Sequence, residues 1–203
     1  MSENPAAHWE TVYHHKQPHE VSWTQNIPQT SLDFIDKLNI SKGSAIIDVG
    51  GGDSKLVDYL LAKGYTNLTV LDISGKALDR AKQRLGTDAA KVKWIAADIT
   101  TFQPDEHYSL WHDRAAFHFL TTTRQIDHYK ALTKAYVTNH LLIGTFSDEG
   151  PLKCSGLDVT RYAPSQLLDL FACDFDLLEW KKQDHTTPFG TVQNFLFGCF
   201  QKR

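Results

Sequence analysis

From residue 44 onward, short apolar runs with strand character alternate along the chain with segments of helical period. The runs that we expect to be strands are 44–49, 67–71, 92–96, 108–112 and 140–146. Such alternation is typical of a parallel β-sheet whose connecting helices cover both of its faces. The sequence therefore predicts an α/β fold.

The end of the chain has a different pattern. After a helix expected at 164–171, two long strand-like runs, 175–183 and 191–201, are separated by a turn at 188–190 (PFG). A turn this short joins only antiparallel neighbours. We therefore expect a seven-stranded, mostly parallel sheet that ends in an antiparallel C-terminal hairpin, with helices on both faces.

Composition and charge limit the possible partners of this chain of 203 residues. A net charge of -3 leaves no basic surface for many phosphates, so nucleic acid is not an expected partner. The apolar runs are far shorter than the roughly 20 residues of a membrane span, so we expect no membrane association either. Cys154, Cys173 and Cys199 form no CxxC pair, which predicts a reducing, cytoplasmic location and no zinc knuckle.

A glycine-rich turn, 48–54 (DVGGGDS), stands between the first expected strand and the helix that follows it. Bare backbone lets a ligand approach there, and the N–H groups of the helix point at it. A dinucleotide fingerprint G-x-G-x-x-G that starts at Gly50 would need its third glycine at Lys55, so that fingerprint fails. A P-loop fails too, because no Gly-Lys-Ser/Thr follows. The turn predicts a nucleotide-type cradle of another kind.

An acidic residue follows each of the next two expected strands. Asp72 lies about 20 residues after the turn, where a carboxylate can accept both hydroxyls of a ribose, and Asp98 follows the third strand. Each feature has a simpler interpretation: a tight connection for the turn, a helix cap for Asp72 and a surface turn for Asp98. Their conjunction favours one shared site, because three strand ends converge on a single ligand that contains a ribose.

Together these features resemble the class I S-adenosylmethionine-dependent methyltransferases, over residues 30–203. The resemblance implies a Rossmann-like sheet with S-adenosylmethionine as the cofactor. It places the methionine part at the glycine turn, the ribose at Asp72 and the adenine amino group at Asp98. The implied cofactor-binding residues are Asp48, Gly50, Gly51, Gly52, Asp72, Ile73, Asp98 and Ile99. Ser54 replaces the usual third glycine of the family, and its small side chain is tolerable there.

Two more stretches, 110–120 (LWHDRAAFHFL) and 154–157 (CSGL), look like a bacterial branch of methyltransferase-domain proteins related to thiol and small protein-lysine methyltransferases. This resemblance places the acceptor pocket at the end of the fourth strand, the loop after the fifth, the last hairpin turn and the front segment. Asp113 and His118 are the catalytic candidates. The alternatives are an ion pair of Asp113 with Arg114 that closes a loop, and a structural histidine.

Residues 1–27 show little periodicity and precede a single expected domain, 28–203. We interpret them as an aromatic lid, because Trp9, Tyr13 and Trp23 are suited to cover a sulfonium by cation-π contact. The alternative is that these rings are core aromatics of the first expected helix, at 28–38. The sequence shows no obvious set of three acidic or amide ligands at the strand ends, so we expect no metal site.

Methyl transfer from a sulfonium is an in-line displacement that needs alignment, exclusion of water and a deprotonated nucleophile. Our main hypothesis is a methyltransferase for a small molecule, with a thiol slightly preferred because a thiolate needs little help. The alternatives are lysine methylation of a protein substrate and a non-catalytic cofactor-binding subunit. The Asn/Asp-Pro-Pro-Tyr/Phe motif of base and glutamine methylation is missing from the fourth strand, which carries 112–115 (HDRA) instead.

Overall fold

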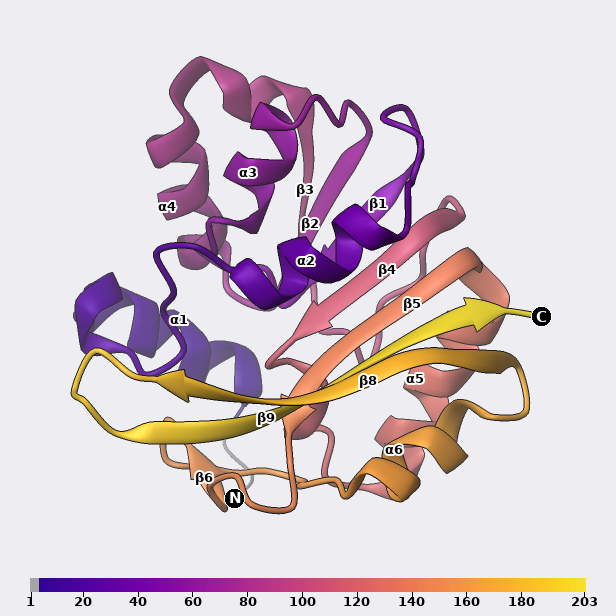
Figure 1. Ribbon diagram of the computed structural model, residues 1–203. Helices are drawn as coiled ribbons and strands as arrows, with labels where there is room; N and C mark the ends of the chain where they lie inside the picture. The colour runs from indigo at the N-terminus through magenta and orange to yellow at the C-terminus, as the bar shows by residue number, and fades with distance from the viewer. Residues whose placement is uncertain (1–3) are drawn as a thin grey trace.

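Seven strands form one sheet in the computed structural model, which describes residues 4–203 (Figure 1). They are β1 Ile46–Val49, β2 Leu68–Asp72, β3 Val92–Ala96, β4 Tyr108–Arg114, β5 Val137–Phe146, β8 Phe175–Thr186 and β9 Val192–Lys202. Their order is β3-β2-β1-β4-β5-β9-β8. The first five strands run parallel, and β9 is antiparallel to both β5 and β8. The predicted sheet with its antiparallel hairpin is confirmed.

Helices cover both faces of this sheet. They are α2 Gln29–Lys37, α3 Leu56–Ala62, α4 Gly75–Leu85, α5 Thr123–Tyr136 and α6 Pro164–Phe171. One apolar core, which includes Ile46 and Leu110, lies under α2, α3 and α4, and the other, which includes Ile47 and Trp111, lies under α5 and α6. Sequence neighbours belong to different cores because successive side chains of a strand point to opposite faces.

Local capping signals fix the ends of the predicted helices. Oγ of Ser74 accepts the N–H of Ala77 at 3.2 Å, so Ser74 caps α4. Gly86 follows α4 with a φ of 58°, a left-handed conformation in which a glycine ends a helix without strain. The parallel pairing of β1 with β2 and of β2 with β3 places their carboxyl ends beside one another at the same edge.

Several elements differ from the prediction. Helix α1 Pro5–His15 was not expected, and it begins at a cap in which Asn4 accepts the N–H of Ala6. Strand β5 starts at Val137 rather than at residue 140, and a small hairpin, β6 Lys153–Cys154 with β7 Leu157–Asp158, follows it. Helix α1 escaped prediction because Val12 and Tyr13 are its only buried residues, so it carries no wide apolar stripe.

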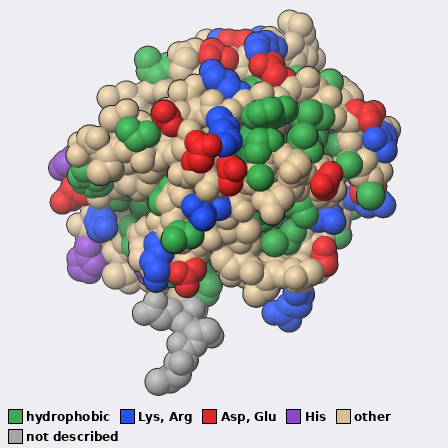
Figure 2. Space-filling view, turned by 60° about the horizontal axis from the view of Figure 1, so that its bottom comes forward, with side chains coloured by type: hydrophobic (Ala, Val, Ile, Leu, Met, Phe, Trp, Pro, Cys, Tyr) green, Lys and Arg blue, Asp and Glu red, His purple; other side chains and the backbone are tan. Residues whose placement is uncertain are grey.

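The surface carries charged side chains of both signs. Figure 2 shows blue and red side chains interspersed over one face, as a small net charge of -3 leads one to expect. Among residues 4–203, no helix combines the length and the apolar character needed to span a bilayer. The same residues contain no group of three or more His, Cys, Asp or Glu side chains arranged to hold a metal ion.

Candidate active site

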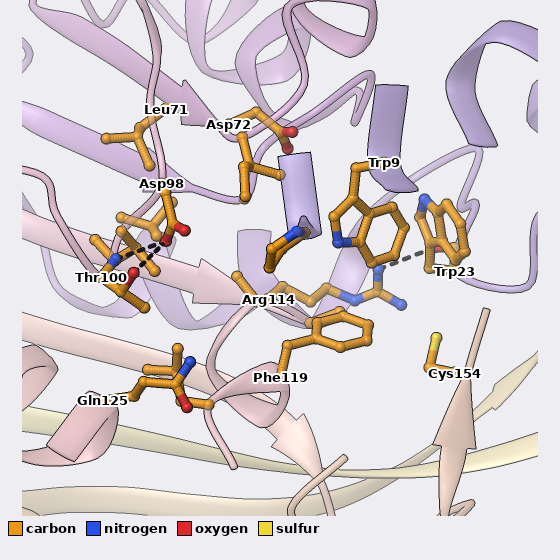
Figure 3. Close-up of a pocket in the computed structure, with 18 of the residues that line it drawn as sticks. Trp9, Trp23, Leu71, Asp72, Asp98, Thr100, Arg114, Phe119, Gln125 and Cys154 are labelled. Atoms are coloured by element: carbon orange, nitrogen blue, oxygen red, sulfur yellow. Dashed lines mark hydrogen bonds between the residues drawn. The ribbon is translucent and has the colours of Figure 1, made fainter. Parts of the chain in front are cut away.

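One cavity, lined by residues of α1, lies at the carboxyl ends of the parallel strands (Figure 3). We call the side bordered by Leu71, Asp72, Asp98 and Thr100 the polar end. The opposite side, the aromatic end, is bordered by Trp9, Trp23, Arg114, Phe119 and Cys154. Figure 3 shows the two groups facing each other across the cavity.

Gly50 is the glycine of the turn that lines the cavity. Gly50 and Gly52 have φ values of 67° and 50°, a left-handed conformation that favours glycine. A Cβ on Gly51 would lie only 2.7 Å from Oδ2 of Asp48. The backbone of the turn is thus packed too tightly for any larger residue, as a close approach to a ligand requires.

Asp48 holds a buried hydrogen-bonded chain instead of facing the cavity. Its Oδ1 lies 2.7 Å from Nδ1 of His112, and Nε2 of His112 lies 2.9 Å from Oγ of Ser31. All three side chains are buried. This chain links the glycine turn to β4 and α2, and nothing in the sequence pattern had joined these residues.

Asp72 is the most perturbed acid of the polar end. Its Oδ1 accepts the N–H of Ser74 at 2.8 Å, and burial, together with the nearby charges of Asp53 and Asp48, raises its pKa to about 7. A Cβ on Gly52 would lie 2.8 Å from Oη of Tyr13 and 3.1 Å from Oδ2 of Asp72, so these two oxygens converge above the turn.

Asp98 is half-buried at the other side of the polar end. Its Oδ1 accepts both the N–H and the hydroxyl of Thr100, each at 2.8 Å. The predicted turn role is therefore present, and the residue lines the cavity as well. Ile73 and Ile99, the residues that follow the two acids, also line it.

Helix α1 is held over the cavity mainly by polar contacts with α4. Oε1 of Glu10 accepts the N–H of Gly75 at 2.6 Å. Arg80 donates to the carbonyl oxygens of Tyr13 and Lys16. The three aromatic side chains predicted to cover a ligand, those of Trp9, Tyr13 and Trp23, all line the cavity.

The aromatic end is a box of rings around one cation. The ring centroid of Trp9 lies 5.5 Å from that of Trp23 and 5.1 Å from that of Phe119. The guanidinium of Arg114 lies 4.8 Å from the ring centroid of Phe195, and its Nη1 donates to the carbonyl of Trp23 at 3.0 Å. Burial lowers the pKa of Arg114 to about 10, so the side chain stays cationic at neutral pH.

The two catalytic candidates lie outside this cavity. Asp113 is buried, and it accepts the N–H groups of Ala116 and Phe117 through Oδ1 and the hydroxyl of Tyr129 through Oδ2. It therefore shapes the loop after β4, rather than forming the alternative ion pair with Arg114.

His118 is also buried, and its ring stacks on that of Phe146 with centroids 4.2 Å apart. Burial, and then the charge of Arg114, lower the pKa of His118 to about 3, so the imidazole is uncharged at neutral pH. Neither His118 nor Asp113 is placed to touch an acceptor, and the site proposed below omits both.

Comparison with known proteins identifies the family. A model of the methyltransferase domain matches residues 46–136, which contain the glycine turn and both strand-end acids. Residues 46–136 of this chain thus match a methyltransferase domain. The malonyl-[acyl-carrier protein] O-methyltransferase of Anoxybacillus flavithermus is 30% identical over 125 residues, 61% of this chain. The chain spans about half the length of that curated relative, since the match covers 47% of it.

Solved structures share the fold of this methyltransferase. An S-adenosylmethionine-dependent methyltransferase of Anabaena variabilis matches 98% of this chain and 96% of its own, with a TM-score of 0.74 and 14% identity. The 1,6-didemethyltoxoflavin-N1-methyltransferase of Burkholderia thailandensis, with bound 1,6-didemethyltoxoflavin and S-adenosylhomocysteine, matches 98% of this chain and 87% of its own. Its TM-score is 0.70 at 16% identity.

The cofactor of the family, S-adenosylmethionine, fits the residues of the polar end. A Cβ on Gly52 would lie 2.8 Å from Oη of Tyr13 and 3.1 Å from Oδ2 of Asp72, two residues that line the cavity, so the missing side chain keeps this space open. Asp72 and Asp98 border the same cavity from neighbouring strands and supply carboxylates that accept hydrogen bonds. A nucleoside and an amino-acid tail both find donors and acceptors of the right kind there.

Proposed function

We propose that this methyltransferase acts on a small-molecule nucleophile bound at the aromatic end of the cavity. S-adenosylmethionine supplies an electrophilic methyl group on a sulfonium. The observation that carries the proposal is that Trp9 of α1, Trp23 and Phe119 enclose the aromatic end of the cavity. A box of this kind admits a compact acceptor and excludes water, which in-line transfer requires.

The residue roles that we propose for the polar end follow from its geometry and from the family resemblance. Asp72 accepts the ribose hydroxyls, Asp98 binds the adenine amino group, and Ile73 and Ile99 pack against the adenine. The glycine turn holds the methionine part. Asp48 acts indirectly, because its hydrogen bond to His112 supports the turn from behind.

The titratable side chains of the aromatic end are protonated at neutral pH. Burial raises the pKa of the Cys154 thiol to about 11 and that of Tyr13 well above 10, and Arg114 remains a cation. Among residues that line the described cavity, we therefore find no general base on this side. The acceptor has to arrive deprotonated, which favours a thiolate or a carboxylate.

Lysine methylation of a protein, the main alternative, is disfavoured by Arg114. A protonated lysine would bring a second positive charge beside a buried guanidinium. The relatives themselves are O- and N-methyltransferases by name, so the choice of acceptor rests on the pocket. In the proposed transfer, a lone pair of the acceptor bonds to the methyl carbon as the carbon–sulfur bond breaks. The electron pair of that bond remains on the sulfur of S-adenosylhomocysteine.

Incubation with a methyl-labelled cofactor tests this function. One arm uses a panel of small thiols and carboxylates, and the other uses proteins of a cell extract. We expect label in a small molecule. Label confined to protein would instead support the lysine methyltransferase, and cofactor binding without any transfer would support the non-catalytic subunit.

Replacement of Asp72 by Ala is expected to weaken binding of S-adenosylhomocysteine about tenfold to a hundredfold. The variant loses charge-assisted hydrogen bonds to the ribose, on the order of 1.5 to 3 kcal/mol. Calorimetry measures the dissociation constant, and D105A is the matched control because Asp105 is exposed on the surface. Unchanged affinity in a folded Asp72→Ala protein would remove the ribose assignment.

Binding of S-adenosylhomocysteine is expected to strengthen as the pH rises toward 7 and then to level off. In the folded protein the pKa of Asp72 is raised to about 7. Between pH 4 and 7 the free folded protein therefore keeps a proton on Asp72, whereas the unfolded chain has released it. The stability of the free protein therefore falls as the pH rises through this window. Ribose hydroxyls favour the carboxylate, so binding releases the proton. Calorimetry from pH 5.5 to 8 should show this trend, and Asp72→Asn should flatten it.

A further inference from the structure

Arg114 carries a polar group that the protein itself leaves without a partner. The residue as a whole is half-buried, but its Nη2 is fully buried and makes no hydrogen bond within residues 4–203. A buried donor without a partner is unfavourable, and more so when it bears a charge. A bound ligand is therefore needed to supply a hydrogen-bond acceptor for Nη2 of Arg114.

The charge of Arg114 is also uncompensated. Arg80, Arg84 and Arg203 each pair with an aspartate, whereas Arg114 has no carboxylate within 4 Å in the described part of the chain. Asp48, whose charge acts to raise the pKa of Arg114, is already hydrogen-bonded to His112. The guanidinium thus borders the cavity as an unpaired cation, beside Trp9, Trp23 and Phe119 (Figure 3).

We propose that Arg114 binds a carboxylate of the methyl acceptor, so that the acceptor is a small carboxylic acid with an apolar or aromatic body. This inference rests on the proposed function and names its substrate class. The planar fork of a guanidinium matches a carboxylate with two parallel hydrogen bonds. The rings around it exclude water, which strengthens such a pair and gives the apolar body of the acceptor its contacts.

The cofactor offers a second source of the same chemistry, the carboxylate of its methionine part. Two contacts favour the acceptor as the source of the carboxylate. Nη1 of Arg114 donates to the carbonyl of Trp23, and the guanidinium lies over the ring of Phe195. Trp23 belongs to the aromatic end, opposite Asp72 and Asp98, and Phe195 also lines the cavity. Arg114 also borders a second cavity on the α2 side of the glycine turn, so the experiment must separate the two carboxylates.

Calorimetry on the full chain loaded with S-adenosylhomocysteine tests the proposal without turnover. The probes are benzoate, phenylacetate and 3-phenylpropionate, each compared with its neutral amide of similar shape. We expect at least one carboxylate to bind about tenfold or more tightly than its amide. Arg114→Met should remove that preference, Arg114→Lys should retain part of it, and Arg203→Met, a change at an exposed arginine, should leave it intact.

The second arm compares S-adenosylhomocysteine with 5′-methylthioadenosine, which lacks the amino acid carboxylate. We expect Arg114→Met to leave both affinities within about twofold. Weaker binding of S-adenosylhomocysteine alone would assign Arg114 to the cofactor and overturn the proposal. A panel in which no carboxylate binds more tightly than its amide would also overturn the proposal. That measurement needs only the unmodified protein, so it holds even if a variant fails to fold. A protein that binds the acids but transfers no methyl group would contradict the proposed function only.

Discussion

A chain that begins at residue 28 is expected to transfer methyl groups at least about a hundredfold more slowly than the full chain, while its sheet stays folded. The missing segment provides Trp9, Tyr13 and Trp23, which form much of the wall of the aromatic end. Without them the acceptor is poorly aligned and water enters. The segment is thus predicted to act as a lid.

The packing of the segment explains why the fold should survive its removal. Its buried apolar residues Val12, Tyr13 and Val21 belong to neither of the two cores that the sheet forms with its helices. It is attached to the remaining chain by hydrogen bonds, such as that of Glu10 with Gly75, and by apolar contacts of Trp9 with Phe119 and of Trp23 with the edge of one core. Removal therefore opens a cavity wall and leaves the sheet's own apolar contacts in place.

Hydrogen exchange of the full chain provides an independent measurement. Amides of α1 should exchange faster in the free protein and become protected when S-adenosylhomocysteine binds. Full-length Trp9→Ala should reduce turnover as well, and W180A is the matched control because Trp180 is exposed on β8. Equal protection with and without cofactor, together with normal activity of the shortened chain, would show that the segment is not a lid.

The strands were predictable because their signals are local. The apolar run 92–96 coincides with β3, and 164–171 coincides with α6, whose start is marked by a proline. Helix α1 was not predictable in this way. It is fixed by a cap at Asn4 and by contacts with residues of α4 that are distant in sequence, such as Arg80. An apolar pattern cannot report contacts of that kind.

The polar end of the site was predictable for a geometric reason. Carboxyl ends of neighbouring parallel strands meet at one edge, so Asp72 and Asp98 had to lie near the glycine turn. The sequence could not predict which of Asp113 and Arg114 points to the cavity. Neighbours in a strand point to opposite faces, and the sequence does not say which face borders the cavity. The structure turns Asp113 toward Tyr129 of α5 and Arg114 toward the cavity.

Substitution of Gly50 by Ala is expected to lower stability by roughly 2 to 5 kcal/mol and turnover by about a hundredfold. The φ of 67° at Gly50 disfavours any side chain. An added Cβ would also lie 2.5 Å from Cβ of Ala116, so the loop after β4 would have to move. That loop directly follows Arg114, and its position is held by two hydrogen bonds to Asp113.

Gly64→Ala separates the two causes of this effect. Gly64 also has a left-handed backbone, with a φ of 85°, but a Cβ there would meet nothing within 4 Å. The Gly64→Ala variant should therefore lose only the stability that depends on backbone conformation, about 1 to 2 kcal/mol, and its turnover should not change. Chemical denaturation and steady-state rates measure both quantities. Equal stability losses in the two variants, with full activity in Gly50→Ala, would mean that the close approach of the turn to the β4 loop does not align the cofactor with the acceptor.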